Sequence, residues 1–96
     1  MSDRLALIRA RLVATFTPSE CQLEDESQLH IGHPGAASGG GHYRLRIVSE
    51  RFEGLNRISR HRLVYDCLGN LMRTDIHALV IVAVAPSDLP YRPRTE

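Results

Sequence analysis

The segment that most constrains the fold is the apolar run Leu79–Ala85, which contains no charged or polar side chain. If the segment is a strand, both of its faces are apolar, with Leu79, Ile81 and Ala83 on one face and Val80, Val82 and Val84 on the other. Strands of this type are usually central in a sheet, so we expect a central strand that ends at Pro86. A chain of 96 residues allows one domain, and we take residues 1–96 as that domain.

The remaining apolar pattern predicts two helices and two further strands. Apolar residues at spacings of three and four predict a helix over residues 3–16. Alternation predicts strands over 20–27 and 42–49 that pair antiparallel, and a second helix is expected from a cap at Asn56 or Ser59 to about Arg73. The order helix, strand, strand, helix, strand predicts an α+β domain with the helices on one face of a three-stranded sheet.

Residues 29–41 form a glycine-rich segment between the first two predicted strands. Five of its thirteen residues are glycine, which predicts a flexible loop, and a loop of this length in a small domain is more often functional than idle. His30 and His33 lie in this loop and His42 follows it directly. The tail 87–96 is expected to be frayed.

Composition excludes several classes of function. All twelve basic residues are arginine, so a P-loop and a Schiff-base mechanism, which both need lysine, are excluded. No triad spacing or isolated carboxylate pair is apparent, so we expect no enzyme and no small-molecule substrate. No apolar run reaches the ~18 residues of a membrane span, and there is no secretory pattern, so we expect a cytoplasmic protein that does not bind membranes. Cys21 and Cys67 are expected to be packing residues.

His77 is the first candidate for chemistry, because it lies at the mouth of the apolar run. An imidazole there could be held rigidly and could form a two-nitrogen metal site with a histidine of the loop. Considered without further information, His77 is more typical of a hydrogen-bonded histidine at the edge of a strand, and a single loop histidine is more typical of a solvated side chain.

Basic residues form a second candidate site. The segment 44–62 holds six arginines against Glu50 and Glu53. Arginine is well suited to phosphate and to carboxylates, so the segment suggests a nucleic-acid surface, a surface for an acidic partner, or a solvated face. Positive side chains in the first turn of a helix oppose its dipole, which is a further hint of function. The candidate nucleic-acid residues are Arg51, Arg57, Arg60, His61 and Arg62.

The chain resembles the BolA family from residue 25 to residue 86. The matching motifs appear in order and at similar spacing: Asp25-Glu26-Ser27 with His30, Gly32-His33-x-Gly35, His42-Tyr43, Ile47-Val48-Ser49, Phe52-x-Gly54, Arg60-His61-Arg62-x-Val64-Tyr65, Ile76-His77-Ala78-Leu79 and Ala85-Pro86. The chain departs from the family in its short C-terminus and in its three histidines in or beside the loop, which leave the loop ligand ambiguous.

The resemblance implies a type II KH-like fold and a partner, a monothiol glutaredoxin of the CGFS type. It also implies a [2Fe–2S] cluster shared with that glutaredoxin and glutathione, and absent from the isolated chain, in iron–sulfur trafficking or iron sensing. His77 would be one ligand; for the second, the motif register favours His30, then His33, with His42 less favoured. The alternative that the family implies is a DNA-binding transcriptional regulator.

Overall fold

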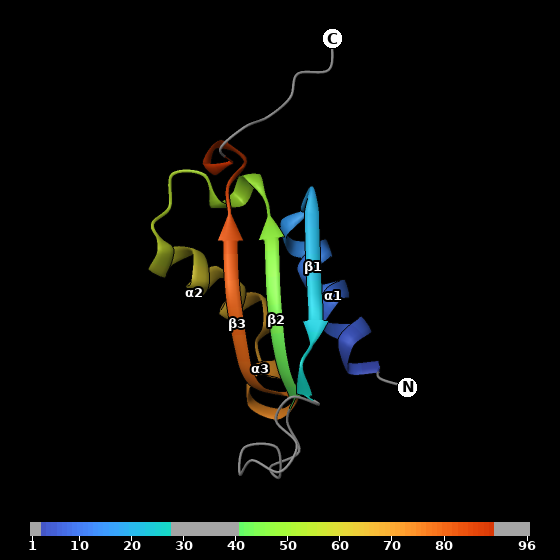
Figure 1. Ribbon diagram of the computed structural model, residues 1–96. Helices are drawn as coiled ribbons and strands as arrows, with labels where there is room; N and C mark the ends of the chain where they lie inside the picture. The colour runs from blue at the N-terminus through green and yellow to red at the C-terminus, as the bar shows by residue number, and fades with distance from the viewer. Residues whose placement is uncertain (1–2, 28–40, 90–96) are drawn as a thin grey trace.

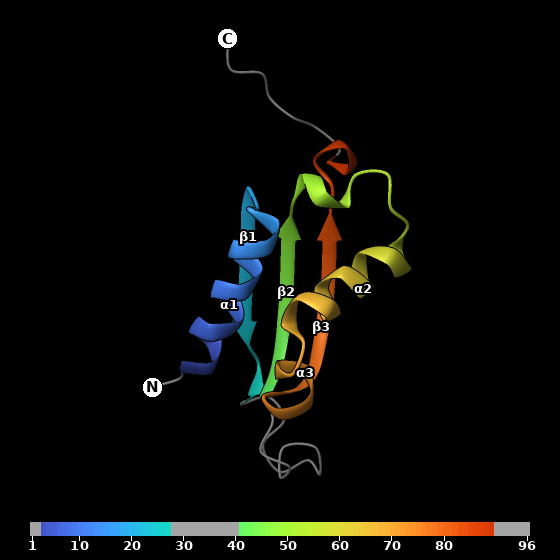
Figure 2. The same ribbon diagram turned by 180° about the vertical axis from the view of Figure 1, so that it is seen from behind.

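The computed structural model describes residues 3–27 and 41–89. Its elements are α1 (Asp3–Phe16), β1 (Glu20–Asp25), β2 (Gly41–Val48), α2 (Arg57–Leu68), α3 (Leu71–Thr74) and β3 (Ile76–Val84), with 3-10 turns η3 (Glu50–Phe52) and η4 (Pro86–Asp88). The strands form one sheet in the order β1-β2-β3, in which β1 is antiparallel and β3 parallel to β2. All three α-helices lie on one face of this sheet (Figures 1 and 2), so the predicted α+β fold is confirmed.

The core lies between the helices and the sheet. The predicted apolar stripe of α1 is buried, and the rings of Phe16 and Phe52 pack with their centroids 5.0 Å apart. Both cysteines are half-buried and pack against this core, as expected. The core includes Ile8, Leu12 and Phe16 of α1, Val64 and Leu68 of α2, and Leu23, Tyr43, Leu45, Ile47 and Ile81 of the sheet.

The prediction that the apolar run forms a central strand is wrong. The central strand is β2, and β3 lies at the edge of the sheet. Only one face of β3 is covered by helices, so Ile81 is 6% exposed while Val80 and Val82 are 46% and 44% exposed. The strand also begins at Ile76, three residues earlier than expected, which places His77 inside it.

The predicted second helix is interrupted. It begins after Asn56, whose side chain accepts a hydrogen bond from the Ser59 N–H, and α2 ends at Leu68. Gly69 follows with a φ of 53°, a left-handed conformation that glycine adopts easily at a helix end. The chain then continues as α3, and the Gly41 N–H donates to the Asp75 carbonyl at 3.1 Å. The break therefore helps to bring the start of β3 beside the start of β2.

The structure covers little of the predicted loop and tail. The loop 29–41 lies outside the described residues except Gly41, which begins β2. Of the predicted tail 87–96, the structure describes residues 87–89, and there the N–H and the hydroxyl of Ser87 donate to the Glu53 carboxylate at 3.0 and 2.6 Å. Residues 90–96 lie outside the described part. None of the helices that the structure describes is long and apolar enough to cross a membrane.

Candidate metal site at the histidine end of the sheet

His77 occupies an irregularity in the pairing of β2 with β3. Gly41 lies opposite Ile76, but His42 lies opposite Ala78, so His77 is an extra residue on β3. Such bulges change the direction of a side chain and are common beside functional sites. The preceding residue, Ile76, is 4% exposed and anchors the strand in the core, whereas His77 is exposed. His77 is thus attached to a rigid strand and remains accessible.

His42 is held at the start of β2 by the residues that follow β1. Its backbone N–H donates to the Ser27 hydroxyl at 3.1 Å, and its carbonyl accepts from the Glu26 N–H at 2.7 Å. Its side chain is half-buried, and the Nε2 atom is buried. The backbone of this second imidazole is therefore fixed by the sheet.

The rings of His42 and His77 lie side by side, with centroids 5.0 Å apart and planes inclined by 46°. Two imidazoles on one metal ion, with metal–nitrogen bonds of ~2 Å, would have ring centroids roughly 4.5–5.5 Å apart. The separation of the two rings is compatible with two ligands of one metal. Within residues 3–27 and 41–89, no group of three or more His, Cys, Asp or Glu side chains could hold a metal ion. In this part of the chain, the two histidines are therefore not part of a larger cluster of such side chains.

The structure describes two of the four predicted ligands, His77 and His42. His77 and His42 are brought together, although sequence reasoning ranked His42 last of the four candidates because it opens a strand. His30 and His33 lie outside the described residues, so their role stays a prediction. His42 lies near His77 because β2 and β3 pair in parallel, which places the starts of both strands at the same end of the sheet.

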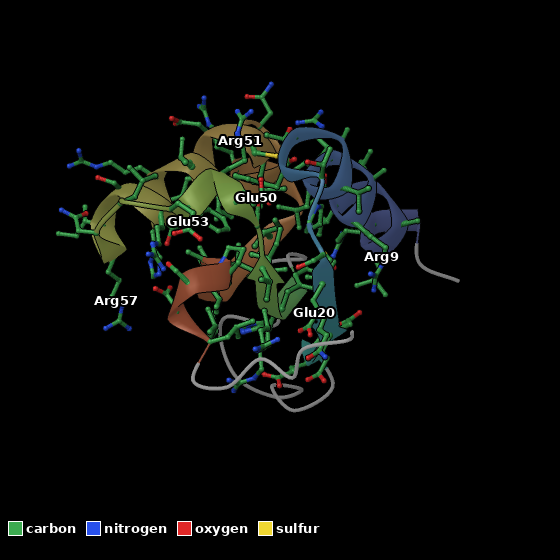
Figure 3. All side chains as sticks on the ribbon, turned by 90° about the horizontal axis from the view of Figure 1, so that it is seen from above. Arg9, Glu20, Glu50, Arg51, Glu53 and Arg57 are labelled. Carbon is green, nitrogen blue, oxygen red and sulfur yellow. The ribbon has the colours of Figure 1, made fainter. Side chains whose placement is uncertain are left out.

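The five predicted nucleic-acid residues lie on η3 and α2. Arg57, Arg60 and His61 line a groove beside β3, whereas Arg51 lines a separate cleft near η3. Arg51 and Arg57 project in different directions in the view from above (Figure 3). Arg62 is exposed on α2.

Arg60 has a structural role that its sequence position does not reveal. Its Nε donates to the Leu55 carbonyl at 2.8 Å and its Nη1 to the Ala83 carbonyl at 3.1 Å. The same nitrogen forms an ion pair with Asp88, and the Arg60 side chain is only 15% exposed. These contacts join the start of α2 to β3 and η4. They stabilise the fold and so offset the unfavourable interaction of a positive charge with the helix dipole near a helix start.

Asp88 makes the stability of this junction dependent on pH. The hydrogen bond from Arg60, followed by that from the Ala85 N–H, lowers the pKa of the Asp88 carboxyl below its ordinary value. Since the pKa is lower in the folded chain, the stabilisation is complete above the unfolded pKa of about 4 and is lost as the pH falls through the folded pKa. We expect Asp88→Asn to destabilise the protein near neutral pH and to lose this effect in strong acid, measured by urea unfolding from pH 2 to 7. In an Arg60→Met background, Asp88→Asn should lose most of this pH dependence; an undiminished dependence would contradict the assignment.

These observations define a class of protein, a small α+β domain with a pair of histidines at one end of a three-stranded sheet. The chain belongs to the BolA-like protein family, whose model matches residues 12–88. The resemblance inferred from the motifs is thereby confirmed.

The relatives of the chain include two plant proteins. It is 39% identical over 94 residues to SufE-like protein 1, chloroplastic/mitochondrial, of Arabidopsis thaliana, covering 93% of this chain and 25% of that protein. It is 39% identical over 93 residues to Protein BOLA1, chloroplastic, of the same organism, covering 94% of this chain and 58% of that protein. The solved BolA domain of SufE1 from Arabidopsis thaliana matches with a TM-score of 0.81 at 39% identity, covering 93% of this chain and 99% of that one. The chain thus spans only part of each of these two full-length relatives.

Proposed function

We propose that the protein is an adaptor that binds a monothiol CGFS glutaredoxin and contributes two imidazole ligands to a [2Fe–2S] cluster shared by the complex. Its role would be iron–sulfur trafficking or iron sensing, without catalysis of its own and, as the sequence predicts, in the cytoplasm. The observation that carries the proposal is the 5.0 Å separation of the His42 and His77 rings, in a chain of the BolA-like family.

The number of ligands supports an adaptor rather than a protein that holds a cluster alone. A [2Fe–2S] cluster takes four protein or small-molecule ligands. A cysteine of the glutaredoxin and the thiol of glutathione would supply two, and this chain would supply His77 and one of His42, His30 or His33. The described pair favours His42, whereas the motif register favours His30. Histidine ligation raises the reduction potential of such a cluster relative to four thiolates.

The residues around His77 would prepare the site before the partner arrives. The buried side chain of Ile76 keeps the bulge in place, and the hydrogen bonds of His42 to Ser27 and Glu26 keep the second strand in register. A ligand on a rigid strand loses little conformational freedom on binding. The exposure of His77 lets a partner approach it without opening the core.

Reconstitution tests the proposal directly. The chain is mixed with a CGFS glutaredoxin, glutathione, ferrous iron and sulfide, and the products are separated by size-exclusion chromatography with absorption read in the visible range. We expect a heterodimer whose spectrum differs from that of the glutaredoxin alone, and no visible absorption from the chain without its partner. Separate elution of the two proteins, or a spectrum identical to that of the glutaredoxin, would contradict the proposal.

DNA binding is the second candidate function, favoured by the exposed Arg57 and Arg62 on α2. Contacts of arginine with phosphate predict an affinity that falls steeply with salt. Arg62→Ala should weaken binding to a DNA duplex and reduce the salt dependence, and Arg60→Ala would act mainly through its contacts with β3. An affinity that does not change with salt or with Arg62→Ala would exclude this function.

A further inference from the structure

The outer edge of β3 presents backbone groups to solvent. The Ser49 N–H donates to the Val84 carbonyl at 3.0 Å, so the backbone of Val84 faces β2. Because the direction alternates along a strand, the backbone groups of Leu79, Ile81 and Ala83 point away from the sheet. The hydrogen bond from Arg60 to the Ala83 carbonyl confirms this direction. Among the described residues, no strand pairs with this edge (Figure 1).

A groove of about 390 Å³ runs along this edge, between β3 and the start of α2. Ile81, Val82 and Ala83 form its strand side, and Arg57 and His61 stand on its helix side. The Arg60 charge in the same groove is matched by Asp88, whereas Arg57 is exposed and has no carboxylate within ion-pair distance among the described residues. The groove is therefore positive on one side and apolar on the other.

The strand itself lacks the features that normally prevent edge pairing. Edge strands are usually protected by charged side chains or proline. Between Asp75 and Asp88, β3 and its flanks carry no charged residue, and proline appears only after the strand. The exposed side chains of Val80 and Val82 extend along the face of the sheet that no helix covers. This edge is thus open to a further strand over most of its length.

We propose that the edge of β3 binds an extended acidic segment of a partner protein, which adds to the sheet as a fourth strand. The backbone of Leu79 and Ile81 would pair with the segment, its apolar residues would contact Val80 and Val82, and its carboxylates would face Arg57. Strand addition of this kind takes its affinity from main-chain hydrogen bonds and its specificity from alternate side chains. A second copy of β3 fits less well, because it carries no acidic residue to face Arg57. Nucleic acid fits less well too, because two exposed valines offer nothing to phosphate.

The probe is a capped synthetic peptide, Thr-Val-Glu-Val-Glu-Val-Thr, titrated into the ¹⁵N-labelled protein, with a lysine-for-glutamate peptide as its control. We expect the largest amide shifts at Leu79 and Ile81, whose N–H groups point outward, and binding of the lysine peptide at least about fivefold weaker. Equal binding of both peptides, or shifts centred elsewhere, would overturn the proposal. Shifts of the same amides that depend on protein concentration without peptide would indicate self-pairing and would also overturn it. The same holds if only a DNA duplex shifts these amides.

Two matched substitutions separate the edge from the rest of the surface. Val82→Glu places a negative charge on β3, and Val13→Glu places the same charge on α1 at nearly equal exposure, 44% against 45%. We expect Val82→Glu to weaken binding of the acidic peptide about tenfold, because it removes an apolar contact and repels the carboxylates, and Val13→Glu to leave this binding unchanged. Arg57→Glu should weaken binding of the acidic peptide and strengthen binding of the lysine peptide. If both valine variants bind as the wild type does, the edge is not the binding site. Cluster reconstitution should be unaffected by Val13→Glu and Val82→Glu, so failure of the edge proposal is distinguishable from failure of the proposed function.

Discussion

His77→Ala is expected to abolish the visible absorption of the complex reconstituted with a CGFS glutaredoxin and glutathione. The substitution removes the exposed imidazole at the bulge of β3 and leaves the buried neighbour Ile76 in place. Without this imidazole, one iron lacks a ligand that water replaces poorly. We therefore expect the amount of bound iron to fall at least about tenfold, similar to the loss of metal affinity when a metal site is altered. Absorption and iron content of the isolated complex are the measurements.

His61→Ala is the matched control, because it removes an imidazole from α2 in the groove beside β3 rather than from the histidine pair. It should retain the absorption of the wild type. Circular dichroism of both variants separates loss of a ligand from loss of the fold. An unchanged spectrum in a folded His77→Ala variant would contradict the assignment of this ligand.

The second ligand is identified by comparing three further alanine variants. If His42 binds iron, His42→Ala should lose the absorption as His77→Ala does, while His30→Ala and His33→Ala keep it. If His42→Ala keeps the absorption, the ligand is the loop histidine whose variant loses it. Retention in all three variants would contradict a two-histidine site.

Gly41→Ala is expected to destabilise the fold by about 1–3 kcal/mol, the usual cost of overpacking a core. A Cβ at Gly41 would lie 2.5 Å from the hydroxyl oxygen and 2.6 Å from two ring carbons of Tyr43. Tyr43 is only 2% exposed, so its ring has little room to move. Since His42 lies between these two residues, the adjustment should also disturb the histidine pair and lower the yield of reconstituted cluster. Urea unfolding and cluster yield are measured on the same variant.

Gly54→Ala is the control for this substitution. Gly54 has a φ of 77° and no atom within 4 Å of an added Cβ, so alanine there introduces backbone strain without a clash. It should cost about 1 kcal/mol and leave cluster yield unchanged. If Gly41→Ala is as stable as the wild type, the Tyr43 ring moves aside without cost. That result would contradict the expected clash.

Local patterns predicted most of the secondary structure correctly. The apolar spacing of α1 defined residues 3–16, and the alternation in β2 separated the buried Tyr43, Leu45 and Ile47 from Arg44 and Arg46. The edge position of β3 could not be inferred in this way, because burial of a strand depends on which strands lie beside it. The interruption at Gly69 was missed because apolar spacing continues through Leu71 and Met72, although the glycine itself indicates a helix end.

The site was less predictable because its contacts are long-range. The sequence identified His77 as a candidate, but its proximity to His42 depends on the parallel pairing and the bulge between β2 and β3. Arg60 was assigned to nucleic acid because its neighbours are basic. Two of its acceptors, Ala83 and Asp88, lie 23 and 28 residues further along the chain, where no local pattern reveals them.

Isotope labelling counts directly the nitrogen ligands that this chain supplies to the cluster. The chain is prepared with ¹⁵N only in its histidines, the glutaredoxin and glutathione are unlabelled, and the reduced complex is examined by pulsed electron paramagnetic resonance. Two strongly coupled ¹⁵N nuclei are expected, and one of the couplings should disappear in His77→Ala. A cluster spectrum with no ¹⁵N coupling from this chain would contradict ligation of the cluster by its histidines.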